Sequence, residues 1–101
     1  MLISSKENAM VKQAKRLLSD ASERRKTATF LIEGARLCED AALTGIHIKT
    51  AFFTQAGETK YPEQVSAIKQ SAEEVFEITD TVSAAISDTK NPQGVFCICR
   101  L

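Results

Sequence analysis

Phe30-Leu31-Ile32-Glu33-Gly34-Ala35-Arg36-Leu37 begins as an apolar strand and continues as the first turn of a helix. The change falls at Glu33 and Gly34, because glycine lacks a Cβ and lets the backbone turn sharply or approach a ligand closely. The large apolar residues on both sides of this pair belong to a hydrophobic core. We therefore predict that this stretch is the central strand-to-helix joint of a small α/β domain.

Length and composition are those of one ordinary globular domain. The 101 residues are 44% hydrophobic and 26% charged, which is enough for a single domain with one core over residues 1–101. No apolar run reaches the roughly 18 residues needed to cross a membrane, and the N-terminus lacks the apolar segment of a signal peptide. These features predict a cytoplasmic protein with no membrane contact.

Three cysteines and one histidine limit the chemistry of the chain. An odd number of cysteines argues against a disulfide scaffold, and Cys97 and Cys99 share one face of the expected last strand. A metal would need two more ligands, and His47 is the only histidine, so we expect reduced, apolar cysteines and no metal site. Without a glycine-rich nucleotide motif or a nucleophile–histidine pair, we predict no catalytic residue and no cofactor site in this chain.

Basic residues are concentrated in the first third of a chain whose net charge is zero. Residues 1–36 carry 8 basic and 4 acidic side chains, and the remaining residues carry 5 and 9. Arg24, Arg25 and Lys26 are consecutive cations that could converge on one phosphate in a loop but would spread around the axis of a helix. A side facing a polyanion and a merely solvated basic surface both explain this distribution.

The spacing of apolar residues predicts helices that alternate with strands. We expect helices over residues 8–19, 35–44, 62–71 and a short stretch capped by Thr79 or Asp80. We expect strands over residues 29–32, 46–54, 75–78 and 95–101, and loops over 20–29, 55–61 and 87–94. This order is typical of a three-layer α/β/α sandwich with a mostly parallel or mixed four-stranded sheet. The buried face of the second helix is expected to consist of Leu37, Cys38, Ala41 and Ala42.

Arg36 and Glu33 are the candidate functional residues at the joint. Arg36 either forms an ion pair with Glu39 or Asp40 on its own helix or contacts an RNA phosphate near the helix N-terminus. Glu33 either caps that N-terminus, which we favour, or accepts hydrogen bonds from a base edge. Gln93 is expected in a turn before the last strand, and a polar contact from it has no support in the spacing.

Three segments together resemble a known family. They are Ser5-Lys6-Glu7-Asn8-Ala9-Met10-Val11-Lys12, then Phe30 to Leu37 with the basic residues before it, and Ile86-Ser87-Asp88-Thr89-Lys90-Asn91-Pro92-Gln93-Gly94-Val95. The chain is similar to the N-terminal substrate-binding domain of the SpoU/TrmH-type RNA 2′-O-ribose methyltransferases. The resemblance covers nearly the whole chain, and the last two segments are specific as a pair.

This resemblance implies an L30e-like α/β/α fold and a role in binding structured RNA, ribosomal RNA more often than transfer RNA. In the family a second, C-terminal domain binds S-adenosylmethionine, forms the homodimer and transfers the methyl group to a ribose. No residue of this chain matches that domain, and the chain stops within an apolar strand, so we expect a piece of a longer enzyme that is not catalytic by itself.

The positions that the resemblance assigns to RNA contact are Arg24, Arg25, Lys26 and Arg36, with Glu33 and Gly34 shaping the joint. Two alternatives remain at this point. One is a stand-alone L30e-like RNA-binding protein, and the other is a protein-interaction α/β module, which the neutral net charge and the scarcity of exposed aromatic residues favour.

Overall fold

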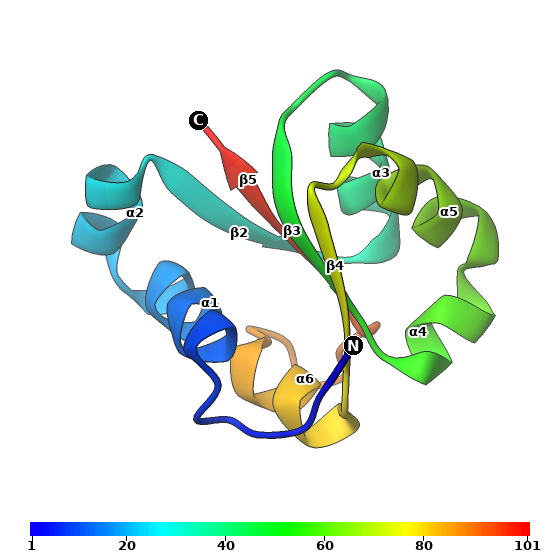
Figure 1. Cartoon of the computed structure of the whole chain (residues 1–101), viewed down its shortest axis with the longest axis horizontal. Coiled ribbons are helices and arrows are strands. Elements are labelled where there is room, and N and C mark those ends of the chain that lie inside the picture. Colours follow the sequence, from blue (N-terminus) through cyan, green and yellow to red (C-terminus); the bar gives the residue numbers. More distant parts are fainter.

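The computed structural model describes all residues, 1–101, as one α/β unit (Figure 1). Its helices are α1 (Ala9–Ser19), α2 (Ala21–Thr27), α3 (Ala35–Leu43), α4 (Gln55–Lys60), α5 (Pro62–Ser71) and α6 (Asp80–Ile86). Its strands are β1 (Leu2–Ile3), β2 (Thr29–Glu33), β3 (Ile48–Phe53), β4 (Glu74–Ile78) and β5 (Val95–Arg100). None of the helices has the length and apolar character needed to span a bilayer.

The strands form one mixed sheet in the order β1-β4-β3-β5-β2. β4 pairs in parallel with β1 and with β3, whereas β5 pairs antiparallel with β3 and with β2. The last strand of the sequence therefore lies inside the sheet, and β2 lies at an edge with β5 as its only neighbour. This arrangement places the strand-to-helix joint beside the segment that leads into β5.

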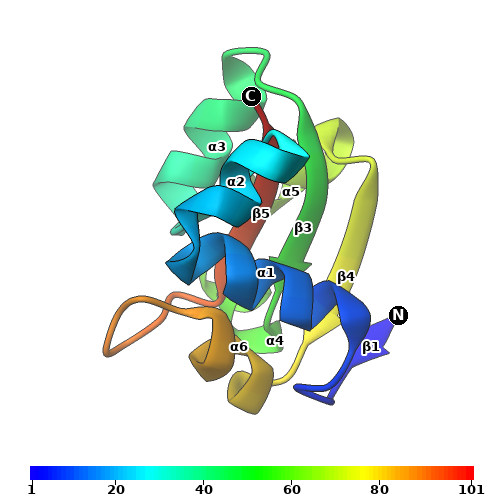
Figure 2. The ribbon, with the colours of Figure 1, turned by 90° about the vertical axis from the view of Figure 1, so that its left-hand side faces the viewer.

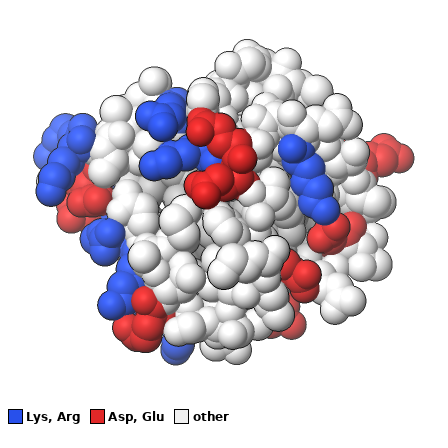
Figure 3. Space-filling view, in the orientation of Figure 1, with Lys and Arg blue, Asp and Glu red and all other residues white.

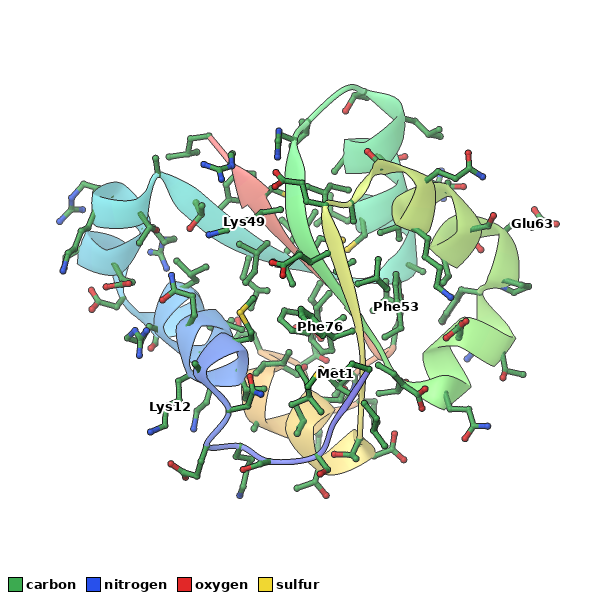
Figure 4. The ribbon with its side chains drawn as sticks, in the orientation of Figure 1. Met1, Lys12, Lys49, Phe53, Glu63 and Phe76 are labelled. Atoms are coloured by element: carbon green, nitrogen blue, oxygen red, sulfur yellow. The ribbon has the colours of Figure 1, made fainter.

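Helices cover both faces of the sheet, so the molecule has three layers and two apolar clusters. One cluster joins α3 and α5 to the sheet through residues such as Cys38, Ile68 and Phe53. The other joins α1 and α6 to the opposite face, and Phe76 packs against it. Figure 4 shows Phe53 and Phe76 on opposite sides of the sheet. The predicted three-layer α/β/α class is confirmed.

Helix α1 shows how the sequence specifies one of these layers. Its buried residues Val11, Ala14 and Leu17 recur at spacings of three and six, so they lie on the face toward the sheet. Asn8 caps the helix by accepting a hydrogen bond from the Met10 N–H at 2.8 Å. The predicted basic outer face is confirmed, and Lys12 points away from the sheet (Figure 4).

Two segments predicted to be loops are helices. Residues 21–27 form α2, which has no buried residue and therefore no apolar periodicity in the sequence. Asp20 caps α2 by accepting from the Ser22 N–H at 2.9 Å, and Ala28 ends it in the left-handed conformation. Residues 55–60 form α4, where Thr54 accepts from the Gly57 N–H at 3.0 Å.

The prediction of four strands was also wrong, because the sheet has five. The additional strand, β1, is two residues long and pairs with the β4 residues Glu77 and Ile78. So short a strand has no alternating pattern that a sequence could display. Leu37 was wrongly assigned to the buried face of α3, since it is 52% exposed, while Ala35, Cys38 and Ala41 make up that face.

Candidate nucleic-acid interface

The joint between β2 and α3 is built from two segments far apart in the sequence. Gly34 is the N-cap of α3 at a φ of 109°, a conformation that glycine adopts without strain. The cap residue offers no side chain, and the first free N–H of the helix, that of Ala35, donates instead to Oε1 of Gln93 at 2.8 Å. Gln93 therefore supplies the cap, and the predicted capping role of Glu33 was wrong.

Glu33 binds the segment after α6. Its carboxylate accepts from the Ser87 hydroxyl at 2.6 Å, from the Asp88 N–H at 2.9 Å and from the Thr89 hydroxyl at 3.3 Å. We call the contacts of Glu33 and Gln93 the loop latch, because together they hold residues 87–93 against the joint. Hydrogen bonds to a charged acceptor are the stronger kind, so the latch gives this otherwise exposed segment a defined position.

Arg36 lies over a hollow of about 330 Å³ beside the latch. The hollow is lined by Glu33, Gly34, Arg36, Leu37, Thr89, Asn91 and Gln93. The Arg36 side chain is exposed and forms no ion pair, because all four ion pairs of the chain involve other residues. The predicted alternative of a pair with Glu39 or Asp40 is therefore wrong, and the guanidinium is free to bind an external anion.

The three consecutive cations of α2 have different surroundings. Arg24 is half-buried and donates to the Leu17 carbonyl at 2.7 Å, so it closes the C-terminal end of α1. Arg25 and Lys26 are exposed and take part in no ion pair. In Figure 3 the Lys and Arg side chains gather along the left of the molecule, over α1 and α2. Figure 2 looks at this side, with α1 and α2 toward the viewer and α3 beside them.

The six predicted site residues form two groups at opposite ends of β2. Glu33, Gly34 and Arg36 meet at its C-terminal end, while α2 precedes its first residue, Thr29. The four residue steps of the strand separate the groups by about 13 Å. Both groups lie along β2, so an elongated polyanion could reach them together. The sequence reasoning missed Ser87, Thr89 and Gln93, although the pairing of two distant motifs was the signal that could have revealed their contact with the joint.

The chain brings together no group of three metal-ligating side chains. Its three cysteines are all buried and reduced. A hydrogen bond with Cys38, together with burial, raises the pKa of Cys97 far above its usual range, and burial followed by the neighbouring Cys97 raises the pKa of Cys99 to about 12. Burial and these neighbours therefore favour the protonated form of both thiols.

The fold and the site define a small α/β/α domain with an accessible basic edge. Residues 8–97 match the family described as the MRM3-like substrate binding domain. The chain belongs to this family, as the resemblance of its motifs predicted.

Individual relatives agree with this assignment. The chain is 29% identical over 99 residues to the 23S rRNA (guanosine(2553)-2′-O)-methyltransferase RlmP of Bacillus subtilis, with 98% of this chain and 37% of the relative covered. A crystal structure of an RNA 2′-O ribose methyltransferase is 29% identical at a TM-score of 0.81, covering 99% of this chain and 37% of the other. The crystal structure of the AdoMet-bound rRNA methyltransferase of Sinorhizobium meliloti is 26% identical at a TM-score of 0.78, and the match covers 99% of this chain and 36% of the other. The chain thus spans little more than a third of these relatives.

Proposed function

We propose that this chain is the RNA-binding, substrate-recognition domain of an S-adenosylmethionine-dependent RNA 2′-O-ribose methyltransferase that acts on ribosomal RNA. The observation that carries the proposal is the match of nearly the whole chain to about a third of enzymes named for this reaction. The exposed cations Arg25, Lys26 and Arg36 support it, because they have no carboxylate partner within the chain.

The role of the domain would be to position the RNA. Arg25 and Lys26 at one end of β2 and Arg36 at the other would neutralise backbone phosphates along the edge. Arg24 would contribute mainly by holding α2 against α1, since its guanidinium already binds the Leu17 carbonyl. Glu33 and Gly34 would shape the joint without touching phosphate, because the Glu33 carboxylate is engaged in the loop latch.

The rest of the parent enzyme would supply the chemistry. A C-terminal domain would bind S-adenosylmethionine, form the homodimer and transfer the methyl group. The AdoMet-bound relative supports the choice of cofactor. Ribosomal RNA is preferred to transfer RNA as the substrate because the relatives are named for it. The protein would act in the cytoplasm, where this RNA is processed. The match to a substrate-binding family and to enzymes named for this reaction favours this assignment over a stand-alone RNA-binding protein or a protein-interaction module.

The test is the salt dependence of RNA affinity, measured by fluorescence anisotropy with a labelled ribosomal RNA hairpin. Affinity should fall steeply as salt is raised, and Arg25→Glu or Lys26→Glu should weaken binding and reduce the slope of the log–log salt plot by about one each. Lys60→Glu is the matched control, since this exposed lysine lies on α4, away from the β2 edge. Salt-insensitive binding, or equal losses in all three variants, would contradict the proposal and favour the protein-interaction module.

A further inference from the structure

The free edge of β2 exposes peptide groups that the chain itself does not use. The Gly34 N–H donates to the Val95 carbonyl at one end of the β2–β5 ladder, and the Leu101 N–H donates to the Ala28 carbonyl at the other. Along a pair of antiparallel strands, residue pairs that form hydrogen bonds with each other alternate with pairs that do not. The β2 residues between Ala28 and Gly34 therefore point their N–H and C=O alternately toward β5 and away from it. Leu31, which lies opposite Ile98, therefore directs both its N–H and its C=O away from β5. No loop backbone group bonds to either of them.

A second hollow, of about 280 Å³, lies against this edge. Four apolar residues line it, Leu18 of α1, Leu31 and Ile32 of β2 and Leu37 of α3, and the polar part of its lining is Glu33, Asp88 and Thr89 of the loop latch. Leu37 is 52% exposed, so its side chain is accessible to a ligand in the hollow. The hollow shares Glu33, Leu37 and Thr89 with the hollow beside Arg36, so the two are adjacent.

The surroundings of this hollow favour one kind of occupant. Apolar walls suit the flat face of a small aromatic ring. The N–H and the C=O of Leu31, which both point outward, offer one donor and one acceptor side by side. Every nucleobase carries donors and acceptors along its pairing edge, and these are available only when the base is unpaired. Arg36, which lines the adjacent hollow and has no ion-pair partner, provides the positive charge for a phosphate.

We propose that this hollow holds one unpaired base of the RNA. The base packs on Leu37 and Leu31, and its pairing edge forms hydrogen bonds with the N–H and C=O of Leu31. Arg36 binds the phosphate of the same nucleotide. This inference rests on the proposed function and adds to it a preference for RNA with an extruded nucleotide at a fixed distance from the phosphates held by α2. The binding energy then has an apolar component that does not depend on salt.

The experiment compares two hairpins with the same stem, one carrying a single unpaired nucleotide and one fully paired. 2-Aminopurine at the unpaired position reports whether that base enters the hollow. The variant is Leu37→Ala, whose exposed position leaves the core intact, and the matched control is Leu43→Ala, a 70% exposed leucine on the same helix that lies outside the hollow. Circular dichroism verifies that both variants are folded.

We expect the protein to bind the hairpin with the unpaired nucleotide more tightly, with a change in 2-aminopurine fluorescence. Leu37→Ala should weaken this complex roughly fivefold, through loss of part of the apolar area that the base covers, and should leave the paired hairpin unaffected. Leu43→Ala should behave as wild type on both. Equal affinities for the two hairpins, with Leu37→Ala and Leu43→Ala indistinguishable, would overturn this inference. If Arg25→Glu then weakened binding of both hairpins, the proposed function would still stand. Binding to neither hairpin would overturn both.

Discussion

Replacing Glu33 by glutamine tests whether the loop latch stabilises the domain. The carboxylate uses one oxygen for the Asp88 N–H and the other for the hydroxyls of Ser87 and Thr89. An amide has only one accepting oxygen, so one of these groups loses its acceptor, and the remaining bonds lose their charge. Hydrogen bonds to charged groups contribute about 1.5–3 kcal/mol and neutral ones about 1 kcal/mol. Since two of the three bonds are exposed, we expect a loss of about 1.5 kcal/mol.

For a domain of this size the loss corresponds to a decrease in Tm of about 6–12 °C. Thermal melts followed by circular dichroism measure it, and amide hydrogen exchange should show that the Asp88 N–H loses protection in the variant. Glu39→Gln is the matched control, because this half-buried carboxylate on α3 takes part in no ion pair. A Tm within 2 °C of that control, with Asp88 exchange unchanged, would refute the latch as a source of stability.

Three further predictions concern the backbone, a buried thiol and an arginine. Gly94→Ala should prevent stable folding, since a Cβ there would lie 2.0 Å from a threonine hydroxyl oxygen. The Cβ of Gly45→Ala meets no atom within 4 Å, so this variant should lose only about 1–2 kcal/mol of stability to backbone strain. Urea titrations of both variants distinguish the two effects. The pKa of the Cys99 thiol is raised to about 12 in the folded state, so the unfolded chain loses this proton first and stability should fall above about pH 9 by up to 1.4 kcal/mol per pH unit; a Cys99→Ala variant that shows the same decline would contradict this. Arg24→Ala should destabilise the domain by about 1 kcal/mol through loss of its carbonyl contact, while Arg25→Ala should not, and equal melting curves would show that the contact contributes nothing.

Much of the architecture could be predicted because its elements bury one face. Helix α1 and helix α5 have apolar residues at helical spacing, and Val95 to Cys99 alternate between the two cores. These patterns are local, and they follow from the burial of apolar side chains. The three-layer class followed from the alternation of such segments.

The missed elements lack that signal. Helix α2 buries no residue, so only its capping by Asp20 distinguishes it from a loop. Helix α4 contains Gly57, which would normally disfavour a helix, but the backbone of Gly94 approaches so closely that an added Cβ would lie 2.6 Å from the Gly94 carbonyl oxygen. Both facts depend on tertiary structure.

The candidate site was predicted in part. Glu33, Gly34 and Arg36 do meet, because they are adjacent in the sequence and surround a turn. The roles of Glu33 and Gln93 were not predictable, since their partners lie 54–58 residues away and no local pattern encodes such contacts. The separation of Arg25 and Lys26 from the joint follows from the length of β2, and it becomes visible only once the strand is placed at the edge of the sheet.

The position of β5 has a consequence for the co-translational folding of the protein. β2 is made early, but its only neighbour in the sheet is β5, the last strand of this domain to be synthesised. Until Val95 to Arg100 have left the exit tunnel, the apolar strand Thr29 to Glu33 has no partner and the loop latch cannot close. The nascent chain therefore exposes an aggregation-prone segment until the whole domain has been translated. We expect folding to occur in one late step after these residues emerge, which makes this domain a natural client of chaperones bound near the tunnel exit.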